Sequence, residues 1–328
     1  MPRFVLPTTT ALFWWCGWHS VCCQDASHQP QPVLRAVAYL QGEVQQWPEQ
    51  HHCYSCHNNG DAARALFAAR SAGIKVPQQF LDRTTNWLVM PGSWKDNGGD
   101  QRFSDQRLAQ FQFSLALAAA HRAELLSDPL PLLQAAKATA KQQQPDGSWP
   151  LDTGGIVASP ITYGRHLGTA LGKNLLQQVD AKAFSLQITK ADKWLRQSRP
   201  HAIPDLSGLM IGLRESQDAA ALKQLDRCQQ LLRAAQAPAG GWGPFATHRA
   251  EPYDTAIVLL AFAQQKPNKP FQPLLQAGRS WLIKQQLEDG SWAETTRPAD
   301  SESYAHRIST TAWATLALIA TQQLFQSR

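Results

Sequence analysis

The sequence predicts an all-α fold: an α/α toroid in which six inner helices form a ring and six outer helices cover it. The first observation behind this prediction is a repeated loop. KQQQPDGSW at 141–149 returns as KQQLEDGSW at 284–292, with weaker copies at 233–243 and 86–94. The second observation is that an amphipathic helical pattern precedes each loop and an alanine-rich pattern follows it. Sustained self-similarity of this kind is the signature of a repeat architecture.

The first helix of each unit is amphipathic, with Lys, Arg and Gln on one side, and is expected on the outside with one stripe buried. These helices begin near Val33, Phe80, Leu132, Ile188, Leu225 and Leu274. The second helix is apolar almost all round and must be covered on every side. These segments are 61–69, 108–120, 166–172, 206–213, 254–263 and 309–320. A closed double ring satisfies both patterns, whereas the alternative, an open stack, leaves the last inner helix partly exposed.

The loop motif DGSW has its own physical logic. Asp-Gly favours a tight turn, because glycine tolerates positive φ and Asp bonds its own backbone. The preceding Gln is expected to satisfy free N–H groups at a nearby helix start. The Trp offers a broad packing face and one N–H donor. We therefore predict clamps between neighbouring units at Gln143, Gly147 and Trp149, at Gln236, Gly240 and Trp242, and at Gln286, Gly290 and Trp292.

Composition narrows the function classes. The chain has 328 residues, of which 43% are hydrophobic and 17% charged, so it can bury a large core. We predict one toroid domain over residues 27–328. The formal net charge is +6, but the basic residues are scattered. Because nucleic-acid surfaces need a concentrated stripe of positive charge, no nucleic-acid partner is expected.

The N-terminus predicts a secretory signal peptide over residues 1–26, and hence a periplasmic or otherwise exported protein. Arg3 is followed by a stretch, 4–23, without Asp, Glu, Lys or Arg. An uncleaved anchor and an unstructured N-terminus are the alternatives. No other apolar run reaches the roughly 18 residues needed to cross a bilayer, so no integral membrane domain is expected after leader removal.

The first loop contains Cys53-x-x-Cys56-His57. In a c-type cytochrome, two such thiols attach haem covalently and the histidine binds the iron. The motif thus predicts a haem c site with His57 as the iron ligand, and a redox partner with it. A Cys53–Cys56 disulfide, free thiols, and a zinc site completed by His51 or His52 are the alternatives.

One unit matches a known repeat position by position. Trp281, Leu282, Gln286, Gly290 and Trp292 follow the pattern aromatic-Leu-x-x-x-Gln-x-x-x-Gly-x-Trp. This pattern resembles the repeat of squalene–hopene cyclases and protein prenyltransferase β subunits. With its Cys-x-x-Cys-His motif, the chain is also similar to a bacterial subgroup of that superfamily. The resemblance implies the toroid over most of residues 33–325.

The resemblance also implies a position for the catalytic acid. This chain departs from the family's pattern at that position. Class II cyclases carry Asp-x-Asp-Asp-Thr-Ala at the start of an inner helix, and the middle aspartate protonates the alkene. Here the stretch at 251–256 reads Glu-Pro-Tyr-Asp-Thr-Ala, so Tyr253 replaces that acid and Glu251 the first aspartate. Tyrosine is far too weak an acid for the task, so authentic squalene cyclisation is not expected. The zinc site of prenyltransferases also has no counterpart, because Asp226-Arg227-Cys228 lies in an outer helix.

Two functions follow as hypotheses. One is a binding or redox-linked scaffold that holds an unknown ligand in the central cavity. The other is an enzyme, a lyase, hydrolase or cyclase, acting there on an isoprenoid or a polysaccharide. For the enzyme, Asp254 is the best acid, with Glu251 and Tyr253 beside it at the cavity mouth; a helix cap is the structural alternative for Asp254. Further acids and bases stand near other inner-helix starts: Asp61, Asp205, His166, His248 and His306.

Overall fold

The structure is a computed structural model that describes residues 31–96, 98, 105–151, 157–265, 269–295, 297 and 303–326. The predicted signal peptide or anchor at 1–26 lies outside the described residues. Within the described part of the chain, none of the helices is both long enough and apolar enough to span a bilayer.

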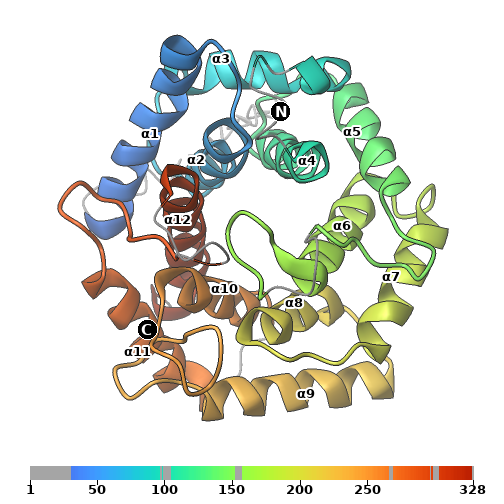
Figure 1. The fold of residues 1–328 in the computed structure, drawn as a ribbon, viewed down its shortest axis with the longest axis vertical. Helices are drawn as coiled ribbons and strands as arrows, with labels where there is room; N and C mark the ends of the chain where they lie inside the picture. The colour runs from blue at the N-terminus through green and yellow to red at the C-terminus, as the bar shows by residue number, and fades with distance from the viewer. Residues whose placement is uncertain are drawn as a thin grey trace, which may run out of the picture.

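The chain forms two concentric rings of helices (Figure 1). The outer helices are α1 (Gln31–His51), α3 (Gln79–Leu88), α5 (Leu130–Lys141), α7 (Ser185–Gln197), α9 (Ala219–Ala234) and α11 (Gln272–Lys284). The inner helices are α2 (Ala63–Ser71), α4 (Gln106–Arg122), α6 (Gly164–Asp180), α8 (Ile203–Leu213), α10 (Pro252–Ala263) and α12 (Tyr304–Gln326). A π-helix, η2 (Cys56–Ala62), leads into α2, and two 3₁₀ turns, η3 (Pro91–Asp96) and η5 (Lys269–Phe271), lie in the connections. The all-α toroid of six helix pairs is confirmed.

Burial follows the two helix types that the sequence distinguishes. In α10 every residue from Tyr253 to Phe262 is buried. The outer helix α9 buries a single stripe, made of Ala221, Leu225, Cys228 and Leu232. This spacing of four, three and four residues is one face of a helix, and it packs on the inner ring. The hydrophobic core is therefore a cylinder between the two rings.

The repeated loops clamp neighbouring units as predicted, in three equivalent copies. Each Trp is fully buried, and its indole N–H donates to a carbonyl at the end of its own outer helix: Thr139, Leu232 and Leu282, at 2.7–2.8 Å. The predicted role of the glutamines is wrong in one respect. Their side-chain amides donate to backbone carbonyls in the first turn of the next outer helix, at Gln187, Leu274 and Pro32, rather than accepting from its backbone N–H groups.

The third clamp closes the ring, because the next outer helix is α1 at the start of the domain. Gln286 Nε2 donates to Pro32 O at 2.8 Å. Gly290 has φ of 92°, and a Cβ there would lie 2.5 Å from Arg35 O, so only glycine fits. In the inner ring, α12 packs against η2 and α2 (Figure 1). The open stack is therefore excluded.

Candidate functional site

A cavity of about 640 Å³ lies on the axis of the toroid, because all six inner helices contribute to its wall. Its apolar wall consists of Leu115, Ala118, Leu171, Leu175, Ile211, Leu260, Leu316 and Trp313. The polar rim, at the C-terminal ends of the inner helices, includes Arg122, Gln178, Arg214, Glu215 and Gln264. Asn174 and Gln177 also line the cavity. A pocket of this size that combines apolar and polar side chains is the usual form of a small-molecule site.

The cavity ends on a buried arginine. Arg64, in the first turn of α2, lines the cavity but is only 6% exposed. Its guanidinium carbon lies 4.2 Å from the centroid of the Trp313 ring, a cation–π contact. We call Arg64 and Trp313 the floor of the cavity.

Beneath the floor lies a fully buried carboxylate, Asp61. It accepts hydrogen bonds from the Tyr163 hydroxyl and from Gln112 Nε2, the latter at 2.8 Å, and lies 3.9 Å from Arg64. Burial raises the pKa of Asp61, although Arg64 and the two hydrogen bonds oppose the shift. Tyr163 has a left-handed backbone (φ 57°), which costs a non-glycine residue on the order of 1–3 kcal/mol. Such strain is typical of functional sites.

Several buried polar atoms around the floor have no hydrogen-bond partner among the described residues. They are Arg64 Nε and Nη2, Gln112 Oε1, Tyr253 Oη and Trp313 Nε1. Tyr253 and Tyr163 both pack edge-on against the Trp313 ring, at 6.1 and 5.4 Å. Buried polar groups are normally satisfied, so a cluster of unsatisfied ones marks a place where water or a ligand supplies the missing partners.

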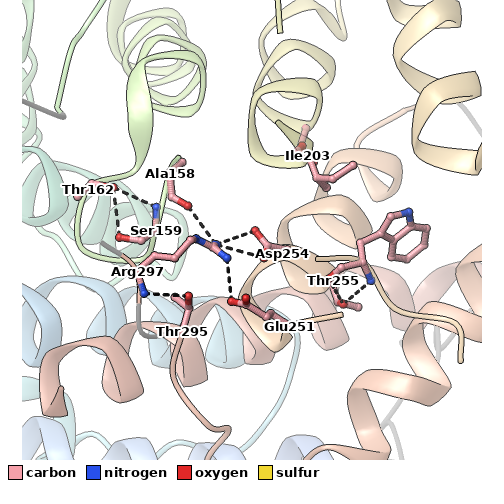
Figure 2. Close-up of polar contacts among 11 residues, drawn as sticks. Ala158, Ser159, Thr162, Ile203, Glu251, Asp254, Thr255, Thr295 and Arg297 are labelled. Atoms are coloured by element: carbon pink, nitrogen blue, oxygen red, sulfur yellow. Dashed lines mark hydrogen bonds and ion pairs between the residues drawn. The ribbon is translucent and has the colours of Figure 1, made fainter. Parts of the chain in front are cut away.

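The predicted acid Asp254 lies elsewhere. It is fully buried near the start of α10, six residues or about 9 Å of helix axis before Leu260 of the cavity wall. Figure 2 shows Arg297 reaching it from the loop after the third clamp. Arg297 Nη2 lies 3.0 and 3.1 Å from the two carboxylate oxygens of Asp254, and Nη1 lies 2.8 Å from Glu251 Oε2. The same guanidinium donates to Ala158 O at 3.2 Å.

This arrangement revises the predictions for 251–254. Asp254 is not the helix cap, because Glu251 holds that position and Asp254 lies in the first turn. Neither acid is among the residues that line the cavity. Burial raises the pKa of Asp254 to about 7, with Arg297 lowering it and Glu251 raising it. The structure thus joins Asp254 and Glu251 through Arg297 into a buried ion-pair cluster, while the Tyr253 ring packs edge-on against Trp313 of the floor.

The remaining acids and bases do not form a second site with these residues. His166 pairs with Asp205 at 3.0 Å, and Asp205 also accepts from the N–H groups of His201 and Ala202 at the start of α8. His248 stacks edge-on against Phe245 in a loop. His306 is buried in α12, where burial lowers its pKa.

The Cys-x-x-Cys-His motif takes part in ring closure. Ser55 caps η2 by accepting from His57 N at 3.1 Å, and Cys56 packs on the core. The His57 ring binds Ser309 of α12 through Nδ1 at 2.9 Å. Burial, with neighbouring His306, lowers the pKa of His57 to about 4. Both thiols are free, and no group of three or more His, Cys, Asp and Glu suited to a metal ion occurs among the described residues.

Haem c attachment was predicted from the motif alone, and the surroundings of His57 do not fit the group. A macrocycle on this ring would have to lie between α12 and η2, where Ser309, Asn58 and Asn59 are fully buried. We therefore expect protein from an export-competent host to give no pyridine haemochrome spectrum and to show Cys53 and Cys56 as titratable thiols after denaturation. A haem band that survives denaturation would contradict this expectation.

Two of the residues that matter most were not predicted. Arg64 could have been found from the sequence, because it is the one basic residue inside the alanine-rich segment 61–69, which had to be covered on every side. An arginine in that position is buried and needs partners. No sequence pattern predicted Arg297, because it lies in an irregular loop 43 residues after the acid that it binds.

Comparisons with known proteins agree with this architecture. Residues 200–327 match the squalene–hopene cyclase C-terminal domain family. The apo type II terpene cyclase MstE from Scytonema has a TM-score of 0.56 over 90% of this chain and 100% of its own, at 14% identity. A variant of that enzyme bound to its substrate, geranylgeranyl dihydroxybenzoate, gives 0.55 over 88% and 97%, at 13% identity.

A glycosidase variant in complex with glucose has a TM-score of 0.53 over 88% of this chain and 97% of its own, at 11% identity. No curated protein matches the chain in sequence. At such identities the structural likeness establishes the fold and leaves the activity open. Residues 200–327 are therefore similar to the squalene–hopene cyclase C-terminal domain family, and the chain as a whole has the α/α toroid fold seen in type II terpene cyclases.

Proposed function

We propose that this toroid binds an elongated apolar molecule of the isoprenoid type in its central cavity. The observation that carries the proposal is the cavity itself: about 640 Å³, on the ring axis, with seven aliphatic side chains in its lining and one aromatic ring at its floor. Burying an apolar chain against such a wall gains roughly 0.8 kcal/mol for each buried methylene. Geranylgeranyl dihydroxybenzoate in the similar MstE fold supports this choice of ligand class.

A sugar ligand fits the cavity less well, although a glycosidase shares the fold. Glycoside hydrolysis uses two carboxylates that face each other across the bond to be cleaved. Among the described lining residues, Glu215 is the one carboxylate, and it lies at the exposed rim.

Binding is proposed in preference to cyclisation because of where the acids lie. Alkene protonation needs a strong acid that reaches the ligand. Asp254 is outside the cavity wall and is held by Arg297, a cation that favours the ionised carboxylate. Asp61 lies behind Arg64, which separates it from the cavity. The geometry therefore supports a ligand-holding toroid whose cyclase acid has been replaced by Tyr253.

The proposal is tested by thermal unfolding with farnesol, a neutral isoprenoid alcohol. We expect farnesol to stabilise the protein by about 2.7 kcal/mol at one hundred times its Kd. Ala118→Phe fills the cavity from α4 and should abolish this stabilisation. Leu130→Phe, on the exposed face of α5, is the matched control and should keep it. A wild-type protein that farnesol does not stabilise, or an Ala118→Phe variant that it still does, would contradict the proposal.

A further inference from the structure

We infer that the ligand of the central cavity carries an anionic head group and that Arg64 at the floor is its anchor. This inference rests on the proposed function and makes it more specific. The ligand would enter head first, pair its carboxylate or phosphate with the guanidinium, and leave its apolar chain along the aliphatic wall towards the rim.

The first support is the incomplete set of partners around Arg64. Its Nε and Nη2 atoms are buried and have no hydrogen-bond partner within the described part of the chain. Asp61 does not fill that role, because its nearest oxygen is 3.9 Å away, beyond hydrogen-bond distance. A buried cation without hydrogen-bond acceptors is costly, and a bound anion would remove that cost.

The second support is that the chain holds Arg64 in place without using up its donors. The Trp313 ring covers one face of the guanidinium, at 4.2 Å. Arginine donates its hydrogen bonds in the plane of the group, so a ring on its face leaves them free. Asp61, fixed by Tyr163 and Gln112, supplies a charge behind the guanidinium that orients it. Asp61, Tyr163 and Gln112 are thus positioning residues for the anchor.

The third support is the charge distribution of the whole cavity. Three arginines line it, Arg64, Arg122 and Arg214, and Glu215 is the one carboxylate among the described lining residues. Burial and the positive charges of Arg64 and Arg214 together lower the pKa of Arg122. The charged lining residues are therefore mostly positive, and a cleft with such a lining attracts anionic ligands.

The two rim arginines are less suited to be the anchor. Arg122 donates to Gln178 Oε1, and Arg214 binds Glu215 at 3.2 Å and Gln264 at 2.6 Å. Both therefore already have acceptors. They would steer an anion towards the cavity, whereas Arg64 offers free donors at its end.

The test compares two probes with the same chain, farnesoic acid and farnesol, by calorimetric titration at pH 8. We expect the wild type to bind the acid roughly 10- to 100-fold more tightly, the usual effect of hydrogen bonds to a charged group. Arg64→Met keeps the apolar stem and removes the charge, so it should lose this preference while its farnesol affinity stays within about threefold. Arg122→Met is the matched control at the rim and should retain most of the preference.

The outcomes separate the two proposals. If neither probe binds the wild type, the proposed function fails. If both bind equally, or if Arg122→Met rather than Arg64→Met removes the preference, the anchor is overturned and the apolar cavity stands. Should Arg64→Met not fold, the wild type alone decides. Its preference for the acid should disappear when the pH falls below the pKa of the probe, and a preference that persists there would overturn the anchor.

Discussion

Replacing Arg297 by methionine is expected to lower the free energy of unfolding by about 3–5 kcal/mol at pH 8, the usual cost of removing one partner of a buried ion pair. Asp254 is fully buried, and both of its oxygens lie within 3.1 Å of Arg297 Nη2. Without the guanidinium, the carboxylate must either stay charged in the interior or take up a proton. Urea unfolding followed by circular dichroism measures the loss.

The loss should shrink as the pH is lowered, and the sign follows from the pKa of Asp254. Burial raises this pKa to about 7 in the folded protein, above its ordinary value near 4 in the unfolded chain. The folded state therefore binds the proton more tightly, and this contribution to stability falls as the pH rises from about 4 to about 7. Removing the positive charge of Arg297 raises the pKa of Asp254 further. The pH range over which this contribution to stability falls therefore extends to higher pH.

The control for this prediction is the double variant Arg297→Met with Asp254→Asn. An amide stands in for the neutral acid, so the double variant should recover much of the stability at pH 8 and lose the pH dependence. His57 has the opposite effect, because its lowered pKa makes the fold less stable as the pH drops below about 6.5. The variants are therefore compared with one another at each pH, since all of them contain His57. Arg227→Met, on the exposed face of α9, should change little. A loss of equal size at pH 5 and pH 8 would contradict the prediction.

The helix pairs could be predicted from the sequence because each inner helix differs so strongly from its outer partner. The stretch 254–263 admits no exposed face, and α9 shows one stripe at helical spacing. The tryptophan part of each clamp could be predicted because it is local: the indole N–H donates to a carbonyl ten residues earlier in the chain. The copy at 86–94 shows the limit. There the chain forms η3, and Trp94 Nε1 has no partner among the described residues, because the glutamine and the turn of the other copies are missing.

The site was harder to predict because its partners are distant in sequence. Asp61 meets Tyr163 across 102 residues and Gln112 across 51. Helical periodicity shows that 61–69 is an inner helix but not which end of it faces a cavity. The resemblance to cyclases predicted the acids at 251–254, whereas the structure places a cluster of unsatisfied polar atoms around Arg64 and Trp313. The arginine inside the otherwise alanine-rich segment 61–69 was the better indication of the site.

Replacing Trp292 by alanine is expected to lower the free energy of unfolding by about 3–5 kcal/mol, the range for large aromatic residues in a core. The ring is fully buried, and its indole N–H donates to Leu282 O at 2.7 Å. Its backbone N–H donates to Thr311 Oγ1 at 3.1 Å, which joins the third clamp to α12. Trp149 and Trp242 have the same burial and the same two bonds, so they are matched comparisons.

The comparison of the three variants tests whether the ring is closed. In an open stack, the last unit has a neighbour on one side only and can fray locally, so Trp292→Ala would cost much less than Trp149→Ala. In the toroid, Gln286 and Gly290 hold α1 at the other end of the domain, so no unit is terminal. We therefore expect the three losses to agree within about 1 kcal/mol in urea unfolding, with unchanged m-values. A loss of unfolding free energy for Trp292→Ala well below the other two losses would show that the sixth unit opens alone. Only in a closed ring is the last clamp as costly to break as the clamps before it.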